Sequence, residues 1–217
     1  MKKHECALFD LDGVIVDTAK YHFLAWKKIA SNFKYNLTHE DNELLKGVSR
    51  IESLKIILKL ANKSLDEVLF EKILIQKNKD YLNFIQNITP EDILPGISEA
   101  LFYLKKKQIK IGLGSASKNA KIVLDLLELT SYFEVIIDGN NINRSKPDPE
   151  VFLRGSSALG IAPDKCLVFE DSASGILAAK TAGMTAVAIG SPDTFLKEDF
   201  CYPNFLTFFK GDLHQLF

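Results

Sequence analysis

The stretch Phe9-Asp10-Leu11-Asp12-Gly13-Val14-Ile15-Val16-Asp17-Thr18 follows a short apolar run, Cys6-Ala7-Leu8-Phe9, that ends abruptly in acid. The run predicts a buried strand. Side chains at i and i+2 of an extended segment point the same way, so Asp10 and Asp12 would bring two like charges together. Like charges this close raise one pKa or require a cation. Two interpretations are open here: an ordinary Asp-Gly turn, or a magnesium-bound carboxylate pair in which one acid is a nucleophile.

Length and composition leave the fold class open but narrow the function. The 217 residues allow one large domain, or a domain that carries a smaller insert. A hydrophobic content of 47% and a charged content of 25% are normal for a globular protein with a real core. The formal net charge of -1 creates no global field for nucleic acid or acidic lipid, so we expect neither partner. An anionic substrate would need local lysine and arginine.

The spacing of the cysteines and the length of the apolar runs indicate the cellular compartment. Cys6, Cys166 and Cys201 are odd in number and lack CxxC spacing, which argues against a disulfide framework or a zinc site. Cys6 and Cys166 lie inside apolar runs and are expected to be buried thiols. No apolar run approaches the length of a membrane span. We therefore expect a cytoplasmic protein without membrane contact.

Residues 21 to about 90 show helical patterns and no convincing strand. Residues 21–33, 51–60 and 65–85 carry apolar side chains at helical spacing. Thr38 and Ser64 each precede an acid by three residues, which is typical of a helix N-terminus. This block predicts a compact helical unit.

After Pro95 and Gly96 the character of the chain changes, and apolar strands alternate with helices. The predicted strands are 110–115, 133–138, 165–170 and 185–190, and the predicted helices between them are 119–127, 149–159 and 174–182. This alternation favours an α/β fold with a doubly wound parallel sheet. Near-continuous apolar strands fit a sheet that is buried on both faces.

The first strand lies before the helical block, which sets the predicted domain organisation. A Rossmann-like catalytic core would comprise residues 1–15 and 92–217. An α-helical cap, residues 16–91, would be inserted after the first strand. The aromatic-rich tail, residues 204–217, is expected to add an edge strand and a closing helix.

Polar residues follow the ends of four predicted strands. They are Asp10 and Asp12 after the first, Ser115 after the second, Lys146 after the third, and Glu170 and Asp171 after the fourth. Ligands collect at the carboxyl ends of strands in a doubly wound sheet. Carboxylates suit magnesium, a hydroxyl beside backbone N–H groups suits phosphate, and a lysine neutralises charge. An aspartate facing this group could attack phosphorus.

Asp10-Leu11-Asp12-Gly13-Val14, Ser115, Lys146-Pro147 and Glu170-Asp171 resemble the four signature motifs of the haloacid dehalogenase superfamily, spaced along the whole chain. The resemblance implies that Asp10 is the phosphoryl-accepting nucleophile and Asp12 the general acid/base. It also implies that Asp10, the backbone carbonyl of Asp12, Glu170 and Asp171 hold Mg²⁺. Ser115 and Lys146 would complete the catalytic set.

Three further segments are similar to the β-phosphoglucomutase family within that superfamily. They are residues 17–22 with Trp26, residues 45–53, and residues 115–119. The resemblance implies a mutase that interconverts β-D-glucose 1-phosphate and glucose 6-phosphate. Its intermediates would be an aspartyl-phosphate and β-D-glucose 1,6-bisphosphate, the latter also an activator.

A mutase must hold a second phosphate at the far end of the sugar. Arg50 on the cap and Lys118 on the core suit that phosphate, because Arg is a planar multidentate donor. The resemblance implies that Thr18 and His22 couple cap closure to Asp12. The remaining predicted substrate-binding residues are Trp26, Lys46, Gly47, Val48, Ser53, Lys77, Ala116, Ser117 and Asn119. From the residues alone, two simpler interpretations stay open. Arg50 could merely begin a helix, and His22 could have a structural role in its helix.

Two other functions remain open. A Mg²⁺-dependent sugar-phosphate phosphatase could use nearly the same residues, with water as the final acceptor. A binding or regulatory module that kept the fold without activity would have no need of Asp10, Asp12, Lys146 and Asp171. We expect a small-molecule sugar phosphate as the ligand, and a monomer.

Overall fold

The computed structural model describes residues 4–191 and 198–217, and within them six strands form one parallel sheet in the order β3-β2-β1-β4-β5-β6. The strands are β1 (Cys6–Phe9), β2 (Lys110–Gly114), β3 (Val135–Ile137), β4 (Cys166–Glu170), β5 (Thr185–Ile189) and β6 (Phe200–Tyr202). β1 lies centrally, with Cys6 opposite both Lys110 of β2 and Cys166 of β4. The strand order reverses there, which confirms the predicted doubly wound fold. Residues 1–3 and 192–197 of the predicted core lie outside the described residues.

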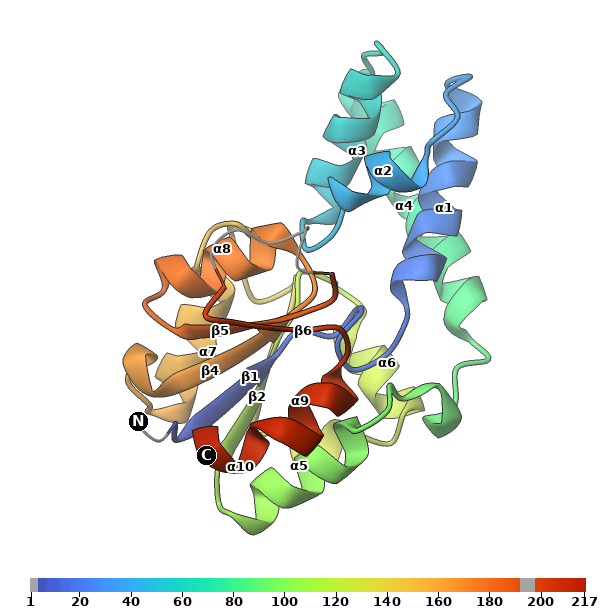
Figure 1. Ribbon diagram of the computed structural model, residues 1–217. Helices are drawn as coiled ribbons and strands as arrows, with labels where there is room; N and C mark the ends of the chain where they lie inside the picture. The colour runs from blue at the N-terminus through green and yellow to red at the C-terminus, as the bar shows by residue number, and fades with distance from the viewer. Residues whose placement is uncertain (1–3, 192–197) are drawn as a thin grey trace.

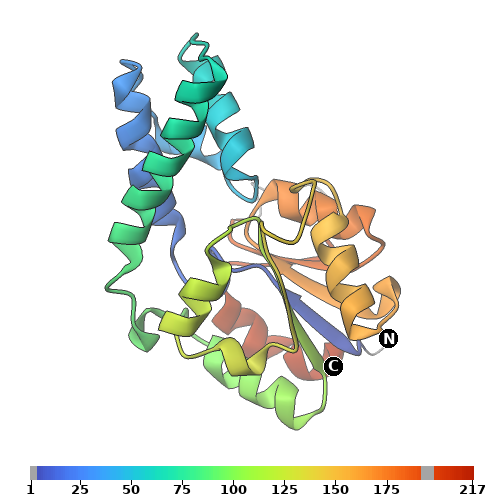
Figure 2. The ribbon, with the colours of Figure 1, turned by 180° about the vertical axis from the view of Figure 1, so that it is seen from behind.

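Helices cover both faces of the sheet (Figures 1 and 2). One face packs against α5 (Ile97–Lys106), α6 (Ala120–Leu126), α9 (Phe205–Gly211) and α10 (Leu213–Leu216), and the other against α7 (Glu150–Leu159) and α8 (Ala173–Thr181). Side chains of β1 alternate between the two faces: Phe9 stacks on Phe169 with ring centroids 4.7 Å apart, whereas Leu8 belongs to the cluster beneath α7 and α8. Burial on both faces explains the continuous apolar strands.

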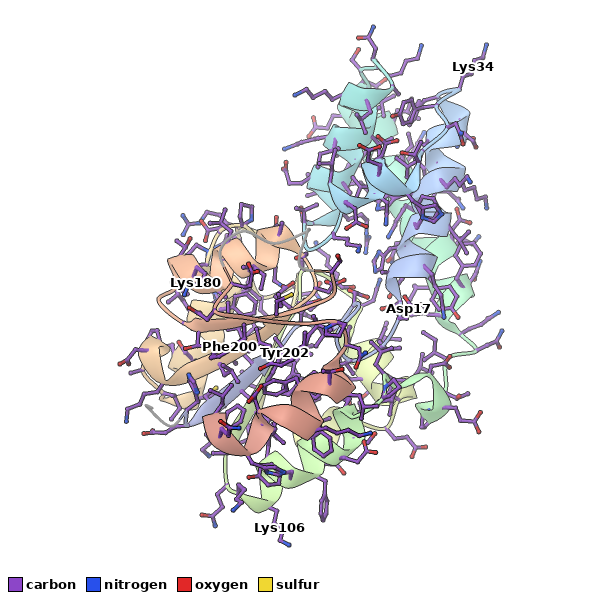
Figure 3. The ribbon with its side chains drawn as sticks, viewed as in Figure 1. Asp17, Lys34, Lys106, Lys180, Phe200 and Tyr202 are labelled. Carbon is purple, nitrogen blue, oxygen red and sulfur yellow. The ribbon has the colours of Figure 1, made fainter. Side chains whose placement is uncertain are left out.

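Four helices stand beyond the carboxyl ends of the strands (Figure 1). They are α1 (Ala19–Asn32), α2 (His39–Glu43), α3 (Arg50–Leu60) and α4 (Glu67–Ile85). They bury a hydrophobic cluster of their own, which includes Phe23, Trp26, Leu54 and Leu74. Asp17, labelled in Figure 3, lies where the chain passes from the sheet to α1. We call these four helices the cap and the remainder the core; boundaries at residues 15/16 and 91/92 stay a prediction.

Three local expectations need correction. The tail forms the two helices α9 and α10, and the edge strand β6 precedes it. Asn204 explains this, because its side chain accepts a hydrogen bond from the backbone N–H of Thr207 and starts α9 there. Helix α5 was not predicted. The N-cap of α4 is Asp66 and not Ser64, since the Asp66 carboxylate accepts from the N–H of Leu69. The cap at Thr38 is confirmed by a full capping box with Asp41.

The expectations about cysteines hold. Cys6 and Cys166 are buried free thiols, and Cys201 is a partly buried free thiol. Within the described ranges, every helix is too short or too polar for a membrane span.

Candidate active site

A cavity of about 560 Å³ lies between the carboxyl edge of the sheet and the cap. Most of the predicted site residues line it: Asp10, Asp12, His22, Trp26, Lys46, Gly47, Val48, Arg50, Ser53, Lys77, Ala116, Ser117, Lys118, Lys146 and Asp171. Thr18, Ser115, Asn119 and Glu170 are outside this lining and buried. Segments separated by more than a hundred residues therefore share one space.

Lys146 joins two strand ends at the floor of the cavity. Its side chain is buried, and its Nζ donates to Asp10 Oδ1 at 2.6 Å and also to Glu170 Oε1. Burial opposes the charge on Lys146, yet the carboxylates of Asp10 and Glu170 outweigh it and raise the pKa of the lysine. The ammonium therefore stays protonated between two acids.

Asp10, Glu170 and Asp171 form a carboxylate cluster, with one oxygen from each within 4.8 Å of the others. Burial, with the charge of Glu170, raises the pKa of Asp10 to about 8 even though Lys146 acts in the opposite direction. Burial and the charges of Glu170 and Asp10 also raise the pKa of Asp171 well above its ordinary value. After burial, repulsion between neighbouring carboxylates is a cause of both shifts, because one buried lysine lies beside three acids. An all-oxygen donor set with excess negative charge fits a divalent cation such as Mg²⁺.

Glu170 is oriented by its neighbours. Its Oε2 accepts from the backbone N–H groups of Asp171 and Ser172 at 3.0 Å each and from the Ser172 hydroxyl at 2.8 Å. These bonds hold the carboxylate in place at the start of α8, so its position does not depend on a bound ion.

Asp12 lies apart from this cluster. The strand ends at Phe9, and the Asp12 carboxylate accepts a hydrogen bond from the hydroxyl of Thr18. His22 Nε2 lies 3.6 Å from Asp12 Oδ1. Burial raises the pKa of Asp12. The Asp12 side chain is thus outside the carboxylate cluster, so a contribution of Asp12 to a metal site would come from its backbone oxygen, as the resemblance implies.

The cap side of the cavity is basic. Lys77 is buried on α4, and its Nζ lies 2.7 Å from His22 Nδ1 and 5.0 Å from the centre of the Trp26 ring. Burial and the nearby Arg50 charge lower the pKa of Lys77 to about 7. Burial, followed by the charges of Lys77 and Arg50, lowers the pKa of His22 well below its usual value. Asp12 is the acid that acts in the opposite direction on Lys77, and a bound anion would further favour the protonated forms of these groups.

The loop before α6 presents polar groups to the same cavity. Ser115 Oγ accepts from the N–H of Ser117 at 3.1 Å, and Ser117 Oγ accepts from the N–H of Asn119 at 3.2 Å. These bonds set the turn that places Ser117 and Lys118 in the cavity wall.

Gly47 brings the cap loop onto the start of α8. Its φ is +70°, and a Cβ there would lie 2.4 Å from Ser172 Oγ and 2.5 Å from Ser174 Oγ. Ser174 Oγ donates to the carbonyl oxygen of Lys46 at 3.0 Å, and Lys46 Nζ lies 4.0 Å from Asp171 Oδ2. A larger residue at 47 would prevent this contact between cap and core.

Sequence reasoning missed several residues at the site. Asn42 and Arg144 line the cavity, Ser174 bonds the cap loop, and Asn78 bonds Arg50 and Asn119. The sequence of α4 carries one signal for Asn78. Its neighbour Lys77 interrupts the buried apolar face that includes Leu74, Tyr81 and Ile85, and a lysine on such a face points to a polar site there. Nothing local marks the others.

Comparison with known proteins shows likeness over nearly the whole chain. Residues 7–189 match the haloacid dehalogenase-like hydrolase family. A β-phosphoglucomutase of Bacillus subtilis (strain 168) is 44% identical over 197 residues, which cover 90% of this chain and 87% of that protein. A phosphorylated carbohydrates phosphatase of Thermotoga maritima is 32% identical over 185 residues, 84% and 83% of the two chains. The crystal structure of a β-phosphoglucomutase from Clostridium difficile matches with a TM-score of 0.92 at 38% identity, over 98% of each chain.

Proposed function

Because this chain belongs to the haloacid dehalogenase-like hydrolase family, we infer that it is a phosphosugar mutase that interconverts β-D-glucose 1-phosphate and glucose 6-phosphate. One observation carries the inference: a single cavity has an acidic floor at the sheet and a basic wall at the cap. With a divalent cation held at the floor, both ends of the cavity suit an anion, as a sugar with a phosphate at each end provides. The 44% identity to a β-phosphoglucomutase supports the assignment.

Asp10 is the proposed nucleophile. Its carboxylate oxygen attacks phosphorus, an O–P bond forms to Asp10, and the bond from phosphorus to the sugar oxygen breaks. In the reverse step a sugar hydroxyl oxygen attacks the same phosphorus and releases Asp10. Lys146 Nζ, already 2.6 Å from Asp10 Oδ1, supplies positive charge beside the transferring group.

Asp12 is the proposed general acid/base. It protonates the sugar oxygen that leaves and removes the proton from the hydroxyl that attacks. Burial raises the pKa of Asp12, which favours the protonated form of a group that must both donate and accept a proton. At the start of α1, the Thr18 hydroxyl donates a hydrogen bond to that carboxyl, and His22 Nε2 lies 3.6 Å from it. Movement of α1 would therefore move the proton-transfer group, so the cap controls whether a sugar or water receives the phosphoryl group.

Mg²⁺ is the proposed cofactor, and Asp10, Glu170 and Asp171 with the Asp12 carbonyl would hold it. When bound, it would neutralise charge on the transferring phosphoryl group. The activating intermediate is β-D-glucose 1,6-bisphosphate, which begins the cycle by phosphorylating Asp10. We further propose a monomeric, cytoplasmic protein whose partner is the sugar phosphate alone.

Arg50, Lys118 and Lys77 are proposed to receive the distal phosphate, and Lys46, whose Nζ lies 4.0 Å from Asp171 Oδ2, is proposed to contact the substrate nearer the floor. Turning the bisphosphate end for end then presents its other phosphate to Asp10. Each phosphate of the bisphosphate binds at the basic wall in turn while the other lies at Asp10. One cavity of about 560 Å³ with Asp10 as its nucleophile can therefore serve both half-reactions.

A sugar-phosphate phosphatase is the second candidate, favoured by the 32% identity to a phosphorylated carbohydrates phosphatase. The two functions share Asp10 chemistry and differ in the acceptor. The deciding assay incubates the protein with Mg²⁺, β-D-glucose 1-phosphate and a trace of the 1,6-bisphosphate. A mutase forms glucose 6-phosphate in large excess over inorganic phosphate, and only slowly from the α anomer. Release of inorganic phosphate without isomerisation would refute the proposal.

A further inference from the structure

Asn78 joins three elements through one oxygen atom. Its Oδ1 accepts from Arg50 Nη2 at 2.7 Å and from Asn119 Nδ2 at 2.8 Å. Asn78 lies on α4, Arg50 opens α3, and Asn119 precedes α6 in the core. The bond to Asn119 therefore crosses from cap to core, between residues 41 positions apart in the chain.

The two donors belong to segments that face the cavity. Arg50 lines it directly, and Asn119 follows Ser117 and Lys118, which also line it. A free arginine side chain samples many rotamers, and ordering it on binding costs affinity. A bond to Asn78 restricts the guanidinium beforehand. A guanidinium carries five N–H donors and a carboxamide two, so Asn78 leaves donors available on both residues.

A carboxamide suits this position better than a carboxylate. Arg50 and the neighbouring Lys77 supply the positive charge of the basic wall, and a neutral oxygen orients Arg50 without cancelling that charge. An aspartate would make the same hydrogen bonds but would place a negative charge beside the anion.

We propose that Asn78 is a positioning residue for the distal phosphate, which aligns Arg50 with the Lys118–Asn119 segment and completes the site only when the cap rests on the core. The proposal deepens the proposed mutase function and rests on it. Asn78 itself does not contact the reacting atoms. Its loss should weaken recognition of the sugar phosphate and leave the chemistry at Asp10 intact.

The test uses Asn78→Ala, with Lys79→Ala as the matched control because Lys79 is the next residue of α4 and exposed. For Asn78→Ala we expect the KM of β-D-glucose 1-phosphate to rise about 10-fold, as for loss of a charged hydrogen bond. Hydrolysis of acetyl phosphate, which has no distal phosphate, should stay within about 2-fold of the wild type, and Lys79→Ala should match the wild type in both assays. An equal loss on both substrates would overturn the proposal.

A double-mutant cycle separates positioning from general damage. In an Arg50→Ala background, Asn78→Ala should add much less than it does in the wild type, because the group it aligns is gone. Additive effects would refute positioning through Arg50. Asn78→Asp keeps the acceptor and should fold normally, so a thermal melt like that of the wild type with weaker sugar-phosphate binding is expected. Binding as tight as in the wild type would contradict the charge argument.

Calorimetric binding of glucose 6-phosphate distinguishes this inference from the proposed function. Binding does not require isomerisation. Loss of affinity in Asn78→Ala supports the positioning role even if the wild type proves to hydrolyse its substrate, whereas unchanged affinity refutes that role even if the wild type isomerises.

Discussion

The floor and the cap wall of the cavity are electrostatic opposites. At the floor, the carboxylates of Asp10, Glu170 and Asp171 lie together, and burial with their mutual repulsion raises the pKa of Asp10 to about 8 and that of Asp171 well above its usual value. At the wall, burial and the charge of Arg50 lower the pKa of Lys77 to about 7, and burial lowers the pKa of Arg50. A bound cation at the floor and a bound anion at the wall would each favour the charged forms of these groups.

The two sides also differ in how they are built. The floor depends on strand ends held by the sheet, with Lys146 and Glu170 wholly buried. The wall depends on helix packing and on a few contacts between cap and core, such as Asn78 with Asn119 and Ser174 with the Lys46 carbonyl. Under the proposed function, the floor would carry the chemistry and the wall would select the acceptor.

The largest expected effect comes from the nucleophile. Asp10→Asn should lower both isomerisation and acetyl phosphate hydrolysis by on the order of 10⁴-fold or more, because both need the same attacking oxygen. Phosphorus NMR of the variant should show no aspartyl-phosphate. Asp17→Asn, an exposed acid near the first linker, is the control and should be nearly unchanged. Substantial residual turnover in Asp10→Asn would mean that another residue attacks.

Lys146→Ala should come next, and it should affect folding as well as rate. Loss of its charge beside Asp10 should lower turnover of both substrates by about 10²- to 10³-fold. It also leaves the buried carboxyl groups of Asp10 and Glu170 without their cationic partner, which we expect to cost about 3 kcal/mol of unfolding free energy. Denaturant unfolding and kinetics of the variant measure the two effects. The exposed Lys165 provides the control, and a variant with unchanged stability would contradict the buried ion pair.

Arg50→Ala should separate the two sides. Isomerisation should fall about 100-fold, since a phosphate loses its charged hydrogen bonds. Acetyl phosphate hydrolysis should change little, because it uses only the floor. Lys55→Ala, exposed on the same helix, is the matched control. Equal losses on both substrates would show that the cap and the floor do not work separately.

The smallest effect should be that the affinities for Mg²⁺ and for glucose 6-phosphate change in opposite directions with pH. Below pH 8, Mg²⁺ must displace the proton that the raised pKa leaves on Asp10, so its affinity should increase by up to about tenfold per unit from pH 6 to 8. Glucose 6-phosphate binding should instead weaken above about pH 7, as Lys77 loses its proton. Calorimetry of each ligand across pH 6–9 tests both trends. The Lys77→Met variant should lose the pH dependence of glucose 6-phosphate binding and retain that of Mg²⁺ binding. If both affinities changed in the same direction with pH, the assignment of opposite charges to floor and wall would be refuted.

Much of the floor could be predicted from local patterns. Asp10, Ser115, Lys146 and Glu170 each follow an apolar strand, and the ends of parallel strands must meet at one edge of a sheet. Prediction failed where local signals were weak or competing. Helix α5 follows a Pro95-Gly96 turn, and this pair of residues predicts a loop. Strand β6 is only three residues long, which is too short to show a pattern.

By itself, the sequence determined the alternation of strands and helices, the inserted helical block and the polar strand ends. Hydrophobic periodicity and turn residues are local properties, and they act within a few residues. Only the tertiary structure decided which groups bond. Lys146 bonds Asp10 across 136 positions, Asp12 bonds Thr18, and Asn78 links Arg50 to Asn119. Such pairings depend on how cap and core pack together, and no periodicity in the chain encodes them.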